Sequence, residues 1–246
     1  MKNLLTSMLS RLLLMSLTIT LFLKDHLQTS PPFAAVTGRI FPSHFAEKNY
    51  KLKLQFLSME TKTKVELQMH FPEIAEQIRA GALFIYPTDT IYGIGCNALD
   101  QKAVENVRKL KERLTNPFSI IVPSKEWITE NCIVSKEAKD WLRKIPGPYT
   151  LILKLKKKNA LAKSVHQEEE TIGVRIPDHW FSTVVRRLGF PIVTTSANRS
   201  ARPFMTSLED LDQKIKDGAD FIIYEGEKKG RPSKIVNLVE GKIKER

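Results

Sequence analysis

Two apolar segments of the sequence each run directly into a cluster of polar side chains. The segments are residues 83–86 (LFIY) and residues 191–195 (PIVTT). The polar residues that follow them are Thr88, Asp89, Thr90, Tyr92, Ser196 and Asn198. Because ligands bind at strand ends in open α/β sheets, this pattern predicts a binding site. Asp, Ser and Asn also bond to neighbouring backbone in ordinary turns, so both explanations stay open at this stage.

Basic residues gather at the end of a predicted helix, as Lys109, Lys111 and Arg113, with Asn116 following. Cations near a helix C-terminus can simply complement the helix dipole. They can also bind phosphate, Arg through paired donors and Lys as a point charge. The sequence has neither GxxxxGK[ST] nor GxGxxG, so side-chain cations would do more of the work if a nucleotide binds.

Two further predicted strands carry polar residues. Thr150 and Lys154 share one strand face with Ile152, because side chains alternate with a period of two. Arg175 is a single cation within an apolar strand, GVRIP. Such an arginine is usually paired or extends its charged end to water, and contact with a carboxylate ligand is the alternative.

The composition limits the class of site. The two cysteines, Cys96 and Cys132, and the five histidines form no metal-ligand motif, so nothing in the sequence supports a protein-built metal site. The cysteine content favours a reducing compartment, and we expect a cytoplasmic location. The formal net charge of +12 favours an anionic partner, although a lysine-rich solvated surface explains it equally well.

Helical and strand patterns alternate from residue 66 onward, which predicts an α/β or α+β sheet covered by helices. The predicted helices are residues 71–81, 100–113, 135–145, 178–189 and 207–218. The predicted N-caps are Asp100, Ser135, Asp178 and Ser207, and the predicted C-caps are Gly81 and Gly189. The predicted strands are residues 82–86, 118–122, 148–157, 171–177, 191–198, 220–226 and 233–244.

The first 58 residues differ from the rest, and we divide the chain into an extension (1–58) and a domain that carries the expected site (59–246). Residues 4–23 are apolar and approach the length of a membrane span, and residues 24–56 have the composition of a linker. A membrane anchor, a targeting peptide, or a true start at Met59 all fit this pattern. A membrane is an expected partner only if residues 4–23 form an anchor.

Six motifs occur in the order found in the YrdC-like family of threonylcarbamoyl-AMP synthases, which residues 66–240 resemble. They are YPTDTIYGIG, K-x-R followed by NPFSIIV, PGPYTLIL, GVRIP, TTSANRSARP and PSKIVNL. The resemblance implies a twisted mixed sheet with a large basic cavity. It also implies nucleotidyl transfer, in which L-threonine, bicarbonate and ATP give L-threonylcarbamoyladenylate and pyrophosphate. That product serves the N6-threonylcarbamoyl modification of adenosine 37 in tRNA, through transfer-complex proteins.

The resemblance also implies roles for particular residues. Lys111 and Arg113 would be catalytic and would engage the ATP phosphates. The residues expected to bind threonine or bicarbonate are Thr88, Thr90, Tyr92, Lys154 and Arg175, with Thr150 and Lys154 on the cavity floor. The other residues expected to bind ATP are Asn116, Thr150, Ser196, Asn198 and Ser233. Mg²⁺ would be held mainly by the ATP phosphates and water.

The sequence departs from the family pattern at four positions. Leu114 replaces a proline in a basic loop that is one residue short, so the alignment of Lys111 and Arg113 with the motif can shift by one position, and Lys109 is the alternative to Lys111. Ala201 stands where glycine is usual, and alanine adopts positive φ less easily. Lys234 and Asn237 replace Thr and Asp, and Lys234 adds a charge in or beside the pocket.

An alternative hypothesis is that the chain is a module that binds double-stranded RNA or tRNA through the basic cavity and does not synthesise the adenylate. The net charge permits it, and the sequence has no run of aromatic residues for stacking single-stranded bases. Salt-sensitive RNA binding without ATP consumption would distinguish this module from the synthase.

Overall fold

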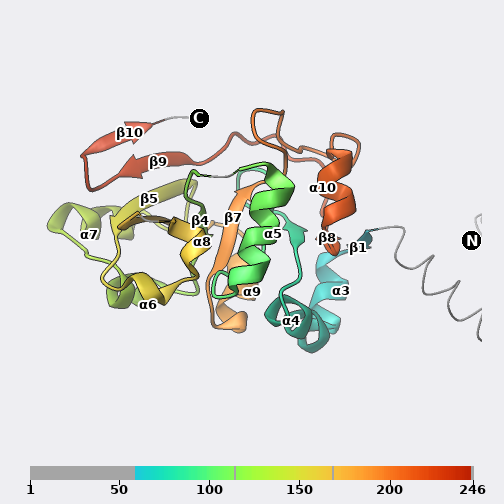
Figure 1. The fold of residues 1–246 in the computed structure, drawn as a ribbon, viewed down its shortest axis with the longest axis horizontal. Helices are drawn as coiled ribbons and strands as arrows, with labels where there is room; N and C mark the ends of the chain where they lie inside the picture. Colours follow the sequence, from blue (N-terminus) through green and yellow to red (C-terminus); the bar gives the residue numbers. More distant parts are fainter. Residues whose placement is uncertain (1–58, 114, 168, 245–246) are drawn as a thin grey trace, which may run out of the picture. The chain divides into compact units, whose positions relative to one another are not determined.

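The computed structural model describes residues 59–113, 115–167 and 169–244. The strands of this part of the chain form one mixed sheet, in the order β1-β8-β2-β3-β7-β4-β6-β5-β9-β10 (Figure 1). They are β1 (Glu60–Lys62), β2 (Phe84–Tyr86), β3 (Gly93–Gly95), β4 (Ser119–Ile121), β5 (Tyr149–Lys154), β6 (Thr171–Arg175), β7 (Ile192–Ser196), β8 (Phe221–Ile223), β9 (Lys234–Asn237) and β10 (Lys242–Lys244). The predicted mixed α/β class is therefore confirmed.

Helices cover both faces of the sheet, with α5 in front of β7 in Figure 1. They are α3 (Lys64–Met69), α4 (Phe71–Arg79), α5 (Gln101–Lys111), α6 (Lys125–Asn131), α7 (Lys136–Arg143), α8 (Lys163–His166), α9 (Phe181–Leu188) and α10 (Gln213–Gly218), with a 3-10 turn η1 (Lys158–Ala160). Helices α3, α4 and α9 pack on one face, and α5, α6, α7, α8 and α10 pack on the other.

The period of two along the strands assigns side chains to these two layers. Phe84 and Tyr86 face the α3–α4–α9 layer, whereas Ile85 faces the α5 layer. Ile121 and Ile120 divide in the same way on β4. Both faces of the central strands are buried, which explains their continuous apolar sequence.

Most predicted caps are confirmed. The Asp100 and Ser135 side chains accept backbone N–H bonds at the starts of α5 and α7. Gly189 ends α9 with φ of 79°. Gly81 lies one residue beyond the C-cap of α4 and has φ of 98°, a value that glycine adopts without strain.

Two predicted N-caps are wrong. Asp178 does not cap α9, which begins at Phe181 without a side-chain cap; the Asp178 N–H instead bonds to the Asp89 carboxylate. Ser207 does not cap α10, because that helix begins only after Asp212, whose carboxylate accepts the N–H groups of Lys214 and Ile215. At α10 a carboxylate further along the chain takes the N-cap position, whereas α9 begins three residues after Asp178.

Several elements were not predicted. Helix α3 has a capping box between Thr63 and Glu66, a signal that the sequence contains. Strand β3 was missed because it is glycine-rich. A Cβ at Gly95 would lie 1.9 Å from the Val193 carbonyl oxygen of β7, so the close approach of β7 requires glycine there.

In the described part of the chain, no helix is long and apolar enough to cross a membrane. The interpretations given for residues 1–58, and the departure at Leu114, lie outside the described residues.

Candidate functional site

A cavity of about 350 Å³ opens on the sheet face that carries α3, α4 and α9. Its described lining has nine hydroxyl-bearing residues and two arginines, and none of its side chains is a carboxylate. The hydroxyls belong to Thr88, Tyr92, Ser119, Thr150, Thr171, Thr194, Thr195, Ser196 and Ser233, and the arginines are Arg113 and Arg175. This set of donors suits an anionic ligand rich in oxygen.

The cavity exists because helices cover only part of this face. Ser119 lies on the same side of β4 as Ile121, which packs under α4 and α9. Gly173 pairs with Ser119 on the neighbouring strand and lines the floor. A Cβ at Gly173 would lie 2.5 Å from the Ser119 hydroxyl, so glycine keeps the floor open.

The Thr88 and Thr90 hydroxyls bond to each other at 2.9 Å within the β2–β3 connection. Thr88 Oγ1 donates to the Ile91 carbonyl at 2.7 Å, so Thr90 must be the donor in the threonine pair. Thr88 lines the cavity and Thr90 is buried beside it. Thr88 Oγ1 also accepts the Thr90 N–H at 3.2 Å, so its hydroxyl is fully used within the turn and Thr88 offers a ligand only its surface.

Arg175 is a buried cation in the cavity wall, 6% exposed. Its Nη2 donates to Asp89 Oδ1 at 2.7 Å and lies 3.4 Å from Thr90 Oγ1. Burial lowers the pKa of Arg175, and the Asp89 carboxylate opposes that shift. Its Nε is buried and has no hydrogen-bond partner. The pairing expected of a strand arginine is present, and the buried Nε–H is left without a partner.

Lys111 is buried behind the cavity and joins α5 to the segment that follows β7. Its Nζ donates to the carbonyl oxygens of Ser196 and Asn198. The Lys111 carbonyl accepts both the N–H and the hydroxyl of Ser200. Burial, and secondarily the charge of Arg113, lower the pKa of Lys111 to about 7. Ser196 lines the cavity, whereas Lys111 and Asn198 do not.

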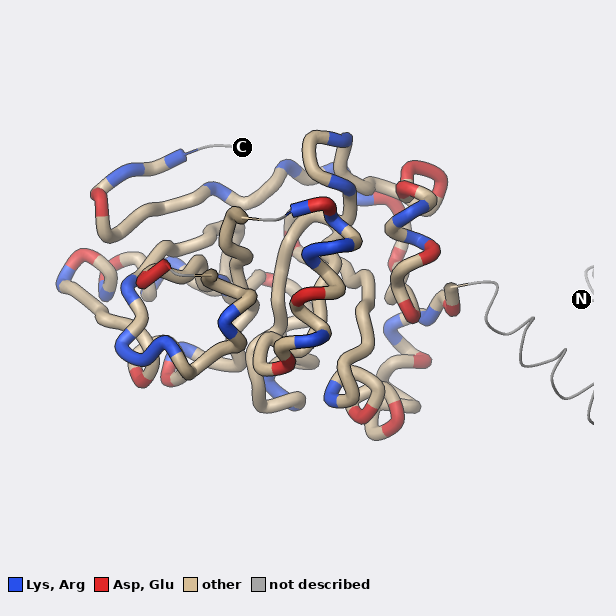
Figure 2. Tube along the Cα trace, in the orientation of Figure 1, with Lys and Arg blue, Asp and Glu red and all other residues tan. Residues whose placement is uncertain are grey.

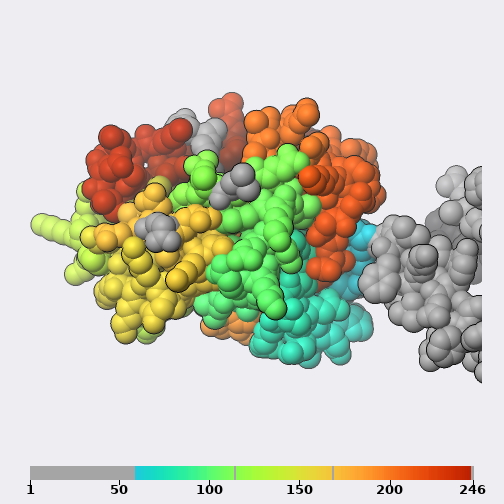
Figure 3. All heavy atoms as spheres, in the orientation of Figure 1, coloured from blue at the N-terminus to red at the C-terminus, as the bar shows by residue number. Residues whose placement is uncertain are grey.

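Arg113 lines the cavity and lies 5.0 Å over the Phe118 ring. Its Nε donates to the carbonyl of Asn116, which is exposed and outside the cavity lining. Arg108 was not predicted: it is buried, and its guanidinium donates to the carbonyls of Arg113, Asn116, Ser164 and Val165. These bonds join α5 to α8, which pack side by side in Figure 3.

Of the two polar residues of β5 that were predicted to line the cavity, Thr150 does and Lys154 does not. The Thr150 hydroxyl bonds to the Ser233 hydroxyl at 2.8 Å, and both line the cavity. Lys154 lies outside the lining and is half-exposed, with its Nζ 2.8 Å from Glu170. The expected place of Lys154 on the cavity floor is therefore corrected, because the strand carries it past the cavity to the surface. Its role in substrate binding stays an untested prediction.

A segment that we name the strap, residues 224–233, leads from β8 to β9 along the edge of the domain that carries many Lys and Arg residues (Figure 2). Tyr92, whose ring lines the cavity, donates its hydroxyl to the Gly226 carbonyl at 2.7 Å. The Glu225 carboxylate accepts from Trp180 at 2.6 Å and contacts His179 at 2.9 Å. Burial raises the pKa of Tyr92 to about 12.

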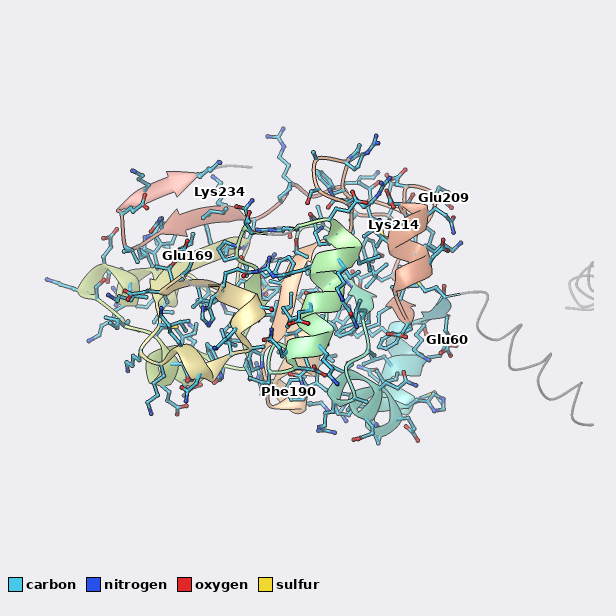
Figure 4. All side chains as sticks on the ribbon, viewed as in Figure 1. Glu60, Glu169, Phe190, Glu209, Lys214 and Lys234 are labelled. Atoms are coloured by element: carbon cyan, nitrogen blue, oxygen red, sulfur yellow. The ribbon has the colours of Figure 1, made fainter. Side chains whose placement is uncertain are left out.

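The departures from the family pattern have distinct structural settings. Ala201 has φ of 62°, the left-handed region in which glycine is favoured. Lys234 lies exposed at the start of β9, outside the cavity lining (Figure 4). The Asn237 side chain accepts the N–H groups of Val239 and Glu240 and so caps the turn between β9 and β10. Lys109, the possible substitute for Lys111, lies at a different surface groove.

The fold and cavity define an α/β domain with a hydroxyl-rich cavity whose donors suit an anionic ligand. Residues 76–245 match the profile of the Sua5/YciO/YrdC family, which is described as telomere recombination. The chain therefore belongs to the Sua5/YciO/YrdC family.

Named relatives support the same family. A Methanocaldococcus jannaschii protein provisionally named threonylcarbamoyl-AMP synthase is 36% identical over 200 residues, covering 80% of this chain and 91% of that protein. The Bacillus subtilis threonylcarbamoyl-AMP synthase is 34% identical over 161 residues, covering 61% of this chain and 46% of the relative. The chain thus spans less than half of the Bacillus subtilis protein.

Solved structures share the fold. Pyrococcus abyssi Sua5, crystallised with L-threonine, has a TM-score of 0.66 and 29% identity, covering 75% of this chain and 55% of that one. HypF in a phosphate- and nucleotide-bound form has a TM-score of 0.62 and 27% identity, covering 70% and 28%. Escherichia coli YciO matches with a TM-score of 0.66 at 23% identity over 76% and 93%, which shows the fold alone.

Proposed function

We propose that this chain synthesises L-threonylcarbamoyladenylate from L-threonine, bicarbonate and ATP, and releases pyrophosphate. The observation that carries the proposal is the composition of the cavity: nine hydroxyl-bearing residues with Arg113 and Arg175, and no carboxylate in the described lining. Phosphates and carboxylates need such donors, and a lining carboxylate would repel them. The names of the relatives and the bound L-threonine and nucleotide in related structures point to the same substrates.

The proposed reaction has two steps. The threonine amine first attacks the bicarbonate carbon, and loss of water leaves a carbamate. A carbamate oxygen then forms a bond to the α-phosphorus while the bond to the leaving pyrophosphate breaks. Negative charge is carried by oxygens throughout, so oriented cations and hydroxyl donors would favour both steps by positioning and electrostatics.

The role proposed for each residue depends on whether it lines the cavity. Arg113 and Arg175 line it and are the proposed contacts for phosphate and carboxylate oxygens, with Thr150, Ser196 and Ser233 as neutral donors. Thr88 and Tyr92 are the proposed wall of the threonine pocket, supported by Thr90. Lys111 and Asn198, which contact each other, are proposed to act by shaping the wall at Ser196.

Magnesium enters the proposal as part of the substrate MgATP. The described residues hold no cluster of His, Cys, Asp and Glu that could bind a metal, and the lining offers hydroxyl oxygens in place of carboxylates. The phosphates are therefore the proposed ligands of the ion. Downstream, we propose that the product feeds the threonylcarbamoyl modification of tRNA through separate transfer proteins.

The test is pyrophosphate release by the full chain with ATP, Mg²⁺, L-threonine and bicarbonate. The proposal predicts release that stops when threonine or bicarbonate is left out. It also predicts strong loss in Thr150→Val, which removes a cavity hydroxyl bonded to Ser233. Asp140→Asn is the control, because that exposed residue pairs with Arg143 and neither lines the cavity. Salt-sensitive RNA binding by a folded chain that releases no pyrophosphate would instead support the RNA-binding module.

A further inference from the structure

Asp89 is a carboxylate beside a cavity whose described lining has none. Its side chain is 10% exposed, and both of its oxygens are used. Oδ1 accepts from Arg175 Nη2 at 2.7 Å, and Oδ2 accepts from the Asp178 N–H at 3.0 Å. Asp89 therefore connects the β2–β3 turn to the end of β6 and to the approach to α9.

The nitrogens of Arg175 are used unequally. Nη2 contacts Asp89 and lies within 3.4 Å of the Thr90 hydroxyl. Nε has no partner, although it is buried, and Arg175 lines the cavity. A buried donor without a partner is costly, so it marks a position that a ligand can stabilise.

The Asp89 contact decides where that donor lies. A guanidinium is planar, so fixing Nη2 on one carboxylate oxygen restricts the orientation of the whole group. Asp89 is in turn fixed by the Asp178 N–H, and it also offsets the cost of burying the arginine charge. The Asp89 side chain therefore both neutralises the buried charge of Arg175 and orients its guanidinium in the cavity wall.

We infer that Asp89 is a positioning residue: it holds Arg175 so that the guanidinium N–H groups that Asp89 does not use, Nε–H among them, meet an anionic oxygen of one substrate. This inference rests on the proposed function. The oxygen belongs to threonine, bicarbonate or ATP, and a loosened Arg175 weakens the binding of that substrate while it leaves the others unchanged.

The experiment measures the KM of each of the three substrates by pyrophosphate release in Asp89→Asn. An amide has one acceptor oxygen, whereas Asp89 uses two, so asparagine must leave Arg175 or the Asp178 N–H without its bond. We expect one KM to rise about tenfold, the size of a weakened charge-assisted hydrogen bond, with a smaller change in kcat. Asp89→Glu, which keeps two acceptors, should recover part of the loss.

Two further variants separate positioning from general damage. In an Arg175→Gln background, Asp89→Asn should add no further change to that KM, because its effect passes through Arg175. Asp212→Asn is the matched control: Asp212 also pairs with an arginine, Arg199, at 2.8 Å and accepts backbone N–H bonds, but it lies outside the cavity lining. It should change stability without changing any KM. If Asp89→Asn does not fold, Asp89→Glu must raise a single KM, because the added methylene shifts the carboxylate that holds Arg175.

The KM values distinguish support for the inference, failure of the inference and failure of the proposed function. One raised KM that depends on Arg175 supports the inference and identifies the bound anion. Equal changes in all three KM values, no change, or an Asp89→Asn effect that persists in Arg175→Gln overturns it and makes Asp89 a structural residue. A wild-type chain without turnover overturns the proposed function itself, whereas wild-type turnover with these negative results overturns this inference alone.

Discussion

At the scale of single residues, Lys111 was predicted to be a catalytic cation, but its hydrogen bonds all join parts of the domain. Lys111 is 3% exposed, and its Nζ donates to oxygens of Ser196 and Asn198, so it holds the cavity wall from behind. The sequence placed it near the phosphates through its position in the K-x-R motif. Spacing along the chain does not specify which side of a wall a side chain reaches.

Lys111 should make stability depend on pH. Its pKa is about 7 in the folded chain, whereas an unperturbed lysine has a pKa of about 10.4. Between these values the unfolded state binds the extra proton, so this residue makes stability rise with pH, by at most about 1.4 kcal/mol per pH unit. Urea unfolding of wild type and Lys111→Met over that window tests the difference. A wild-type advantage that stays constant or shrinks with rising pH would contradict it.

Ala201 has φ of 62°, where a Cβ is unfavourable. Ala201→Gly should therefore stabilise the domain by about 1 kcal/mol, measured by chemical denaturation. The matched control is Ala80→Gly, because Ala80 is also exposed but has φ of −73°; that change should not stabilise. Destabilisation by Ala201→Gly would show that the alanine side chain makes a contact that outweighs the strain.

At the scale of elements, the start of α10 was predicted at Ser207 and lies at Asp212. The Asp212 carboxylate accepts two backbone N–H groups and pairs with Arg199, which links α10 to the segment after β7. We expect Asp212→Ala to cost about 1–2 kcal/mol in unfolding free energy and Ser207→Ala to cost much less. An equal loss of unfolding free energy in the two variants would contradict the assignment of Asp212, and not Ser207, as the N-cap of α10.

The sequence predicted elements well where local signals agreed with the tertiary structure. Helix α5 is an example, with its Asp100 cap and its buried Val104 and Val107. It failed where contacts distant in the chain decide the outcome. Strand β3 uses Gly95 to admit β7, and the Asp178 N–H is taken by Asp89. In the site, types of residue were predictable, whereas the division between lining and supporting residues required the packed sheet.

At the scale of the whole domain, the strap connects strands that are far apart in the sheet order and brings Ser233 to the cavity. It passes so close to the β2–β3 turn that a Cβ at Gly230 would lie 2.0 Å from the Thr90 carbonyl oxygen. The strap therefore contacts the cavity wall at two places, the β2–β3 turn and Thr150 of β5, to which Ser233 bonds.

Gly230→Ala should displace the strap from Thr90. We expect a loss of about 1–3 kcal/mol in unfolding free energy, as for overpacking elsewhere, together with weaker binding of ATP and threonine. Denaturation and calorimetric titration measure the two effects, and Lys229→Ala at the exposed neighbouring position is the control. Unchanged substrate binding in a destabilised Gly230→Ala would mean that the strap supports the fold but not the site.

The most direct test of the account follows the atoms of the product. The full chain is incubated with MgATP, L-threonine and carbon-13-labelled bicarbonate, and the nucleotides are analysed by mass spectrometry. The proposed synthesis gives an adenylate that contains both the threonine and the labelled carbon, formed together with pyrophosphate. ATP that stays intact, or AMP formed without either group, would contradict the proposed synthesis.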